Sequence, residues 1–229
     1  STGQVPADVD VLVLIAPENW SDKERYAVDQ YLMRGGAVVV ASGSYKIALD
    51  SWSGGLVAQP LVSGVASLLE SYGVQVESSL VLDNRNEPFP VAVNRTVSGF
   101  QVQEIQAVAY PFFVDVRNDA MAQDHPVVSN LPAVTLNWAS PLALDEAKNA
   151  EREVTVLLQS TEDSWKLSGD ATMLGSAPNI QPDFDTYPEL GFAAGTAQQS
   201  YPLAAVVQGT FASAFSGKPS PLEATENPT

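Results

Sequence analysis

DVDVLVLIAPENWSDKERYAVDQYLMRGGAVVVAS, residues 8–42, has the pattern of one complete β-α-β unit. Residues 8–15 form a β-branched apolar run that is too apolar to alternate, which is typical of a strand covered on both faces. Residues 37–41 have the same character and predict a second buried strand. A strand, a helix and a strand this close together are expected to give parallel pairing through a right-handed connection.

The residues between these two strands carry the signals that begin and end a helix. Ser21 lies three residues before Glu24, which is the spacing of a capping box. Apolar residues then recur at helical spacing as far as Leu32. The glycine pair at 35–36 predicts the end of the helix, because glycine adopts the left-handed backbone conformation without strain.

The unit predicts an α/β fold with an open, mainly parallel sheet in a three-layer arrangement. We predict a single α/β domain over residues 5–216. Residues 84–109 contain prolines, a glycine and alternating valines, which indicate a β-rich excursion outside the main sheet. Residues 165–200 are expected to be loop-rich. Residues 1–4 and 217–229 are expected to be flexible ends of a piece cut from a longer protein.

Composition limits the classes of partner. The chain has 27 acidic and 11 basic residues, for a formal net charge of −16. Such a surface repels phosphate backbones and anionic headgroups, so we expect no nucleic-acid binding and no membrane binding through charge. No apolar run reaches the roughly 20 residues that cross a bilayer. Any membrane attachment is therefore expected through segments absent from this chain.

The sequence offers few residues for catalysis or metal binding. The chain has no cysteine and a single histidine, His125, so it cannot form a metal site with two such ligands. No G-x-S-x-G, G-x-G-x-x-G or P-loop motif occurs, and we predict no catalytic residue and no cofactor. Asp183 and Asp185 have the spacing of the first ligands of a calcium loop, but no glycine or distant glutamate follows in register. We therefore predict no metal site.

A group of polar residues follows the two strands of the unit. Glu18 and Trp20 come after the first strand, and Ser42, Ser44 and Lys46 come after the second. Ligands of open α/β sheets gather beyond the carboxyl ends of the strands. These residues therefore predict a polar lip with an aromatic floor, which suits a small polar ligand such as a sugar. The alternative is that such loops are polar in any α/β protein and that Trp20 packs on the helix it precedes.

Several segments resemble the gliding-motility-type auxiliary proteins of ABC transporters. The sharpest match is the run DQYLMRGG at residues 29–36, which enters a valine-rich strand, together with residues 8–17 and 21–24. Further matches lie at residues 68–74, 80–83, 125–128, 138–142, 157–165 and 202–215. The resemblance thus covers most of the chain.

The resemblance implies a flavodoxin-like or amidotransferase-like sheet without established catalytic residues. It implies an extracytoplasmic domain, periplasmic or at the cell surface, of a protein anchored to the inner membrane. It also implies that the domain begins upstream with a strand and a helix, and that the ABC permease and ATPase subunits of the same system are its partners. This chain has Ser42-Gly43-Ser44 where relatives usually have Asp-Pro, so no site residue is carried over from the family.

Three functions are compatible with these observations. We expect a noncatalytic extracytoplasmic module of an ABC-type transport system that binds a ligand or partner subunits. One alternative is an α/β hydrolase-like or amidotransferase-like enzyme, which would need a nucleophile with a base. The other is a purely structural protein-interaction domain. An exposed apolar patch would favour an interaction domain, and a deep polar pocket by Trp20 and Ser42 would favour ligand binding.

Overall fold

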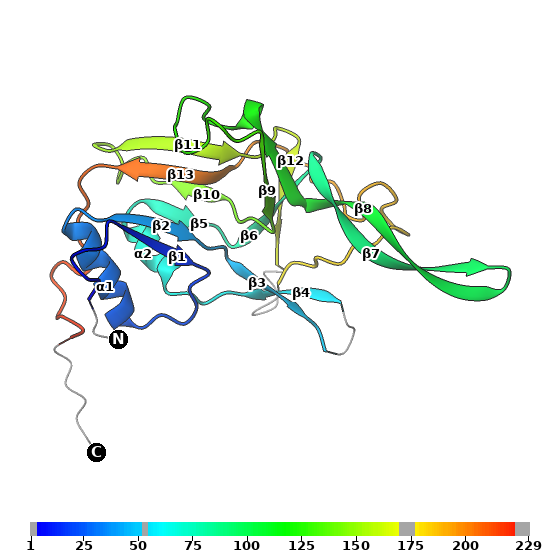
Figure 1. The fold of residues 1–229 in the computed structure, drawn as a ribbon, viewed down its shortest axis with the longest axis horizontal. Helices are drawn as coiled ribbons and strands as arrows, with labels where there is room; N and C mark the ends of the chain where they lie inside the picture. The colour runs from blue at the N-terminus through cyan, green and yellow to red at the C-terminus, as the bar shows by residue number, and fades with distance from the viewer. Residues whose placement is uncertain (1–3, 52–54, 170–176, 223–229) are drawn as a thin grey trace, which may run out of the picture.

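The computed structural model describes residues 4–51, 55–169 and 177–222, and only the backbone of residues 91–97 (Figure 1). Its helices are α1 (Asp22–Met33), α2 (Val65–Ser71) and the short 3-10 helix η1 (Asn118–Ala120). Its strands are β1 (Val11–Ile15), β2 (Ala37–Ala41), β3 (Tyr45–Leu49), β4 (Leu56–Pro60), β5 (Val74–Val76), β6 (Ser79–Asp83), β7 (Asn86–Val97), β8 (Phe100–Arg117), β9 (Ala133–Asn137), β10 (Leu142–Leu144), β11 (Glu153–Gln159), β12 (Ser164–Ser168) and β13 (Pro202–Gln208).

The β-α-β unit forms as predicted from its local signals. β1 and β2 pair in parallel, with an unbroken register along both strands. α1 connects them and begins at a capping box, in which the Ser21 amide donates to Glu24 Oε2 at 2.7 Å. Gly35 has φ of 89°, the left-handed conformation that ends a helix. The predicted helix and the parallel pairing are therefore confirmed.

The prediction of a three-layer, open, mainly parallel sheet of the flavodoxin-like or amidotransferase-like kind is wrong. The pairs β3–β4, β5–β10, β6–β12 and β11–β13 and the sheet β7–β8–β9 are all antiparallel. The successive strands β3 and β4, and likewise β7 and β8, have connections too short for a crossover, and short connections force antiparallel pairing. The pairs β5–β10, β6–β12 and β11–β13 instead join strands that are not successive. β7 turns into β8 at Ser98 and Gly99, which both have the positive φ that a two-residue hairpin turn requires. The β-α-β pattern therefore holds for residues 8–42, and the other strand pairs in the described part of the chain are antiparallel.

The prediction that the first two strands are buried on both faces is also wrong. On one face, Leu12, Leu14 and Val38 pack with α1 and α2 in a hydrophobic cluster around Val28 and Leu68, here called the α1–α2 cluster. The other face, here called the outer face, shows four side chains that are between 50% and 76% exposed: Val11, Val13, Ile15 and Val39. Apolar runs are expected of strands covered on two faces, and this run shows that an uncovered face can carry the same residue types.

The main core lies among the antiparallel strands. β6 is buried along its whole length and pairs with β12. β8 lies between β7 and β9, and its residues Tyr110 and Phe112 are buried. The rings of Trp138 and Phe192 pack edge to face against Tyr110, the arrangement that the charge distribution of aromatic rings favours. This core holds the ends of β6 and β8 in place.

β7 and β8 continue beyond the body of the molecule as a long two-stranded hairpin (Figure 1). Their register runs from Pro88↔Ala109 to Val97↔Phe100, whereas β9 pairs with residues 113–117 of β8. We call residues 88–109 the arm. Within the described part of the chain, no third strand pairs with the arm.

Candidate functional site

The loop that follows β1 is held in an unusual conformation at the predicted polar lip. Ala16 and Asn19 have φ of 42° and 52°, although neither is glycine. Their amides donate to Ala41 O at 2.8 Å and Val62 O at 3.0 Å. Non-glycine residues in the left-handed region cost on the order of 1–3 kcal/mol each and persist only where surrounding contacts hold them. The loop therefore presents Glu18 in a defined position.

The structure brings Glu18 and Lys46 together at this lip. Lys46 Nζ lies 2.8 Å from Glu18 Oε1 and 3.1 Å from Glu18 Oε2. Both side chains are exposed to solvent, so the ion pair contributes at most about 1 kcal/mol to stability. One cation and one anion thus stand at the carboxyl end of the parallel strands, where ligands of such sheets gather.

The other residues of the predicted lip are engaged within the chain. Ser44 Oγ donates to Glu77 O at 2.7 Å, which ties the lip to the turn between β5 and β6. Trp20 packs into the α1–α2 cluster. The hydroxyl of Ser42 makes one long contact, 3.5 Å, to the next carbonyl along the chain. Ligand binding at the lip stays a prediction, with Glu18 and Lys46 as its solvent-facing charges.

A shallow hollow of about 350 Å³ lies near the start of β1 and includes none of the lip residues. It is lined by Tyr31, Arg34 and the segment that precedes β1. Tyr31 OH donates to Val9 O at 3.1 Å, and Arg34 Nη2 donates to Val5 O at 2.9 Å. These bonds fasten the N-terminal segment to α1, so we regard the hollow as a consequence of that packing.

Replacing Trp20 by alanine is expected to lower the free energy of unfolding by about 2 kcal/mol, because the indole packs into the α1–α2 cluster. The expected loss is smaller than for a fully buried tryptophan, since Trp20 is half-buried. Urea denaturation followed by circular dichroism measures it. Lys46→Ala removes only the exposed ion pair and should stay within about 1 kcal/mol of the parent chain. Equal stability of W20A and the parent would contradict the packing role.

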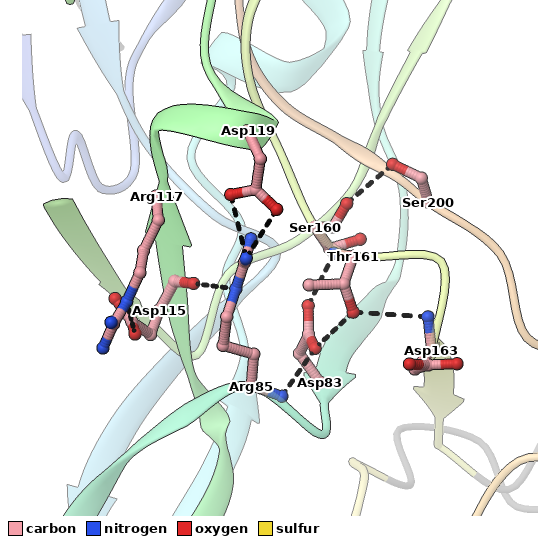
Figure 2. A network of polar contacts seen from close by, with 9 residues as sticks. All are labelled: Asp83, Arg85, Asp115, Arg117, Asp119, Ser160, Thr161, Asp163 and Ser200. Carbon is pink, nitrogen blue, oxygen red and sulfur yellow. Dashed lines mark hydrogen bonds and ion pairs between the residues drawn. The ribbon is translucent and has the colours of Figure 1, made fainter.

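A second polar site, which sequence reasoning missed, joins three segments at the end of β6 (Figure 2). Asp83 is the last residue of β6 and is fully buried. Its Oδ1 accepts from the Arg85 amide at 2.8 Å and from the Thr161 hydroxyl at 2.7 Å. Its Oδ2 accepts from the Thr161 amide at 2.7 Å. Asp83 therefore fastens the β6–β7 turn to the turn between β11 and β12.

Arg85 continues this network to the end of β8. Its Nη1 donates to both carboxylate oxygens of Asp119, at 2.9 and 2.7 Å, and its Nε donates to Asp115 O at 2.9 Å. The hydrogen bond from Arg85 lowers the pKa of Asp119, which favours the ionised carboxylate. This contribution to folding is present at neutral pH and is lost as the pH falls through the lowered pKa. The buried carboxylate of Asp115 accepts from Arg117 Nε at 2.6 Å.

The hydrogen bonds from Arg85 and Thr161 to Asp83 hold separate turns of the chain together, and we call this group the clamp. The hydroxyl of Thr161 donates to Asp83 at 2.7 Å, and the hydroxyl of Ser200 donates to Ser160 O at 2.7 Å. Among the residues that the structure describes, neither hydroxyl is paired with a histidine or lysine that could accept its proton, as a nucleophile requires. The signal available in the sequence was a charged residue at the end of an apolar strand, such as Asp83 after SLVL. Its partner Thr161 lies 78 residues away, a pairing that local pattern does not predict.

Within residues 4–51, 55–169 and 177–222, no three histidine, aspartate or glutamate side chains are placed to share a metal ion. The Asp183 carboxylate accepts the Thr186 amide at 3.0 Å. Hydrogen bonding from the Thr186 side chain, followed by this bond from its amide, lowers the pKa of Asp183. His125 closes a turn, with Nδ1 accepting the Val127 amide at 3.3 Å. None of the helices in the described part of the chain combines the length and the hydropathy that a membrane crossing requires.

The sequence matches a known family over its whole length. A family model described as "ABC-type uncharacterized transport system" covers residues 1–229. The chain belongs to this family of ABC transport auxiliary proteins. An uncharacterized protein of Borreliella burgdorferi is 22% identical over 160 residues, which is 70% of this chain and 29% of that protein. The chain thus spans less than a third of that relative.

Proposed function

We propose that this auxiliary component is a noncatalytic, extracytoplasmic module that binds partner subunits of its transport system. The observation that carries the proposal is the outer face of the β1–β2 sheet, where Val11, Val13, Ile15 and Val39 are exposed together. Parallel sheets are almost always covered on both faces. Contiguous apolar surface of this kind marks a contact site for another protein.

The charge distribution supports a protein partner. The outer face carries no charged residue, in a chain whose formal net charge is −16. Ala37 and Ala41 flank Val39 on the same side of β2 and keep that surface flat. The pair Glu18 and Lys46 stands at the carboxyl end of these strands and offers one polar contact of each sign. A partner that is apolar at its centre and polar at its rim fits this arrangement.

Trp20 packs into the α1–α2 cluster, and Ser44 donates its hydroxyl hydrogen to Glu77 O. Because both residues already have partners within the chain, binding of a partner protein is better supported than binding of a small polar ligand at the lip. The resemblance to gliding-motility-type auxiliary proteins supports the extracytoplasmic location and makes the permease and ATPase of the same system the expected partners.

Val13→Glu tests this proposal, because it places a charge at the centre of the outer face without altering the α1–α2 cluster. The variant is introduced into the full-length protein in its own cells, and the protein is purified from detergent extracts. We expect the amount of permease and ATPase that co-purifies to fall at least ten-fold, since burying an unpaired charge is costly. Val127→Glu, an exposed valine in a turn elsewhere, is the matched control. Equal recovery of both subunits with V13E and V127E would overturn the proposal.

A further inference from the structure

The two faces of the β1–β2 sheet have the same kinds of side chain, but a helix covers only one of them. On the covered face, α1 packs Val28 and Leu32, one helical turn apart, against the apolar side chains of the strands. On the outer face, Val13 and Val39 are direct neighbours in the register, and both are exposed. Sheets whose strands are all parallel have helices on both faces. The same kind of element is therefore expected to cover the outer face.

The outer face has the length of a short helix. β1 and β2 have five residues each, so at about 3.3 Å per residue the face is roughly 17 Å long. A helix covers this length in about 11 residues, because it rises 1.5 Å per residue. α1, which packs on the opposite face of the same two strands, has 12 residues. A single helix of about three turns would therefore cover the outer face.

The charged residues around the outer face are mainly acidic. Asp8 and Asp10 precede β1 and are exposed, and neither forms an ion pair with another described residue. At the other end of the strands, Glu18 is already paired with Lys46. The whole chain has a formal net charge of −16. Acidic residues on an approaching helix would therefore be repelled, and basic residues would be attracted.

We propose that the outer face binds an amphipathic helix of a partner subunit, with an apolar stripe of about three turns and Lys or Arg residues beside that stripe. The proposal rests on the proposed function, which makes the outer face a contact with another subunit, and it adds the kind of element that makes the contact. Every third or fourth residue of this helix packs on Val13 and Val39, as Val28 and Leu32 of α1 pack on the opposite face.

A second copy of this chain fits the outer face less well than such a helix does. Two strands about 4.8 Å apart give a face of roughly 160 Å², against the roughly 800 Å² per partner of a standard interface. Two copies would also each bring a formal net charge of −16. The contact with a helix is equally small, so we expect it to form one part of a larger interface between subunits.

A strand added to an edge of the sheet is the other element that could bind here. In the described part of the chain, β1 and β2 pair only with each other, so each has an edge open to a further strand. An added strand would leave the outer face uncovered, because strands pair edge to edge. It would lie about 4.8 Å from one of Val13 and Val39 and about twice as far from the other. A helix across both strands would contact both residues.

Photo-crosslinking from position 13 identifies the bound segment. p-Benzoylphenylalanine replaces Val13 in the full-length protein in its own cells, and mass spectrometry identifies the crosslinked peptide. We expect a peptide of another subunit, with apolar residues at helical spacing and Lys or Arg beside them. The same replacement at Val127, an exposed valine in a turn elsewhere, is the matched control and should not give this peptide.

The crosslinked peptide separates failure of this proposal from failure of the proposed function. A peptide of another subunit that has acidic residues beside its apolar ones, or apolar residues at every second position, would overturn the helix and leave the proposed function standing. Crosslinks only within the same polypeptide, crosslinks only to a second copy, or no crosslink at all would overturn both.

A cysteine scan of the crosslinked peptide tests its structure directly. Val13→Cys and Val39→Cys are made singly, and the chain contributes no native cysteine. Residues of the peptide are replaced by cysteine one at a time, and the disulfide yield is measured after mild oxidation. From both positions we expect yields that peak at every third or fourth residue, roughly five-fold above the residues between the peaks. Peaks at every second residue, yields without a period, or high yields from only one of the two positions would overturn the proposal.

Discussion

Asp29→Ala is expected to lower the free energy of unfolding by about 3–5 kcal/mol, the largest effect we expect of any single substitution here. Asp29 is fully buried in α1. Its Oδ1 accepts from Tyr72 OH and from the Ala214 amide, and its Oδ2 accepts from Ser213 Oγ, each at 2.7 Å. Alanine would leave these three donors without this acceptor, at a cost of about 1–3 kcal/mol for each donor that stays buried and unsatisfied.

The same substitution is expected to release the segment that follows β13. Asp29 is the acceptor that joins α1 to residues 213–214, next to Phe215, whose ring packs edge to face on Tyr26. Burial, followed by the bond to Asp29, raises the pKa of Tyr72, so its phenol remains a hydrogen-bond donor at neutral pH. Chymotrypsin cleavage after Phe215 measures release of the segment, and urea denaturation measures the loss of stability.

Asp22→Ala is the matched control for Asp29→Ala. Asp22 lies on the same helix, but its side chain is exposed and pairs with Arg25 at the surface. We expect D22A to change the free energy of unfolding by no more than about 1 kcal/mol and to leave chymotrypsin cleavage after Phe215 unchanged. If D29A and D22A unfold at the same urea concentration, the buried carboxylate does not hold α1 to the C-terminal segment.

Asp83→Ala is expected to lower the free energy of unfolding by about 3 kcal/mol. The carboxylate is fully buried and accepts three hydrogen bonds, one from the Arg85 amide and two from Thr161. Alanine would leave these donors without this acceptor and would separate the β6–β7 turn from the β11–β12 turn (Figure 2). Urea denaturation, monitored by tryptophan fluorescence, reports on this region because Trp165 is buried beside it in β12.

A double-mutant cycle separates the Asp83–Thr161 contact from other effects. Thr161→Val removes the hydroxyl but keeps the amide, so we expect a loss of about 1 kcal/mol. In the double variant the two losses should be less than additive, because both substitutions remove the same hydroxyl contact. Asp163→Ala, an exposed aspartate in the same turn, should stay within about 0.5 kcal/mol of the parent. Additive losses, or equal stability of D83A and D163A, would contradict the role assigned to Asp83.

Only part of the candidate site could be predicted from the sequence. The sequence placed Glu18 and Lys46 at the carboxyl ends of two adjacent strands, and the structure joins them in an ion pair. The sequence did not show that Ser44 donates to Glu77 O, because that partner comes from a turn elsewhere in the chain. It also did not indicate the clamp at Asp83, whose contacts reach Thr161. A side chain's type is visible in the sequence, but its partner depends on which distant segments meet.

Local signals in the sequence determined the first part of the fold. The capping box at Ser21 and Glu24, the glycines at 35–36 and the two apolar runs around them specified a helix between parallel strands. Each of these signals acts between residues near one another in the chain, so the local structure that it specifies does not depend on contacts with distant segments. The composition also determined the acidic surface, with a formal net charge of −16.

Only the tertiary structure decided how the remaining strands pair and which surfaces stay open. An apolar run such as β6 specifies burial but not a partner, and its antiparallel pairing with β12 joins segments about 80 residues apart. Val13 has the same hydropathy whether its face is covered or exposed, so the outer face was not visible in the pattern. The same holds for Asp29, whose burial depends on residues 213–214 folding back onto α1. Pairing and burial are set by contacts between distant segments, and these contacts exist only once the chain has folded.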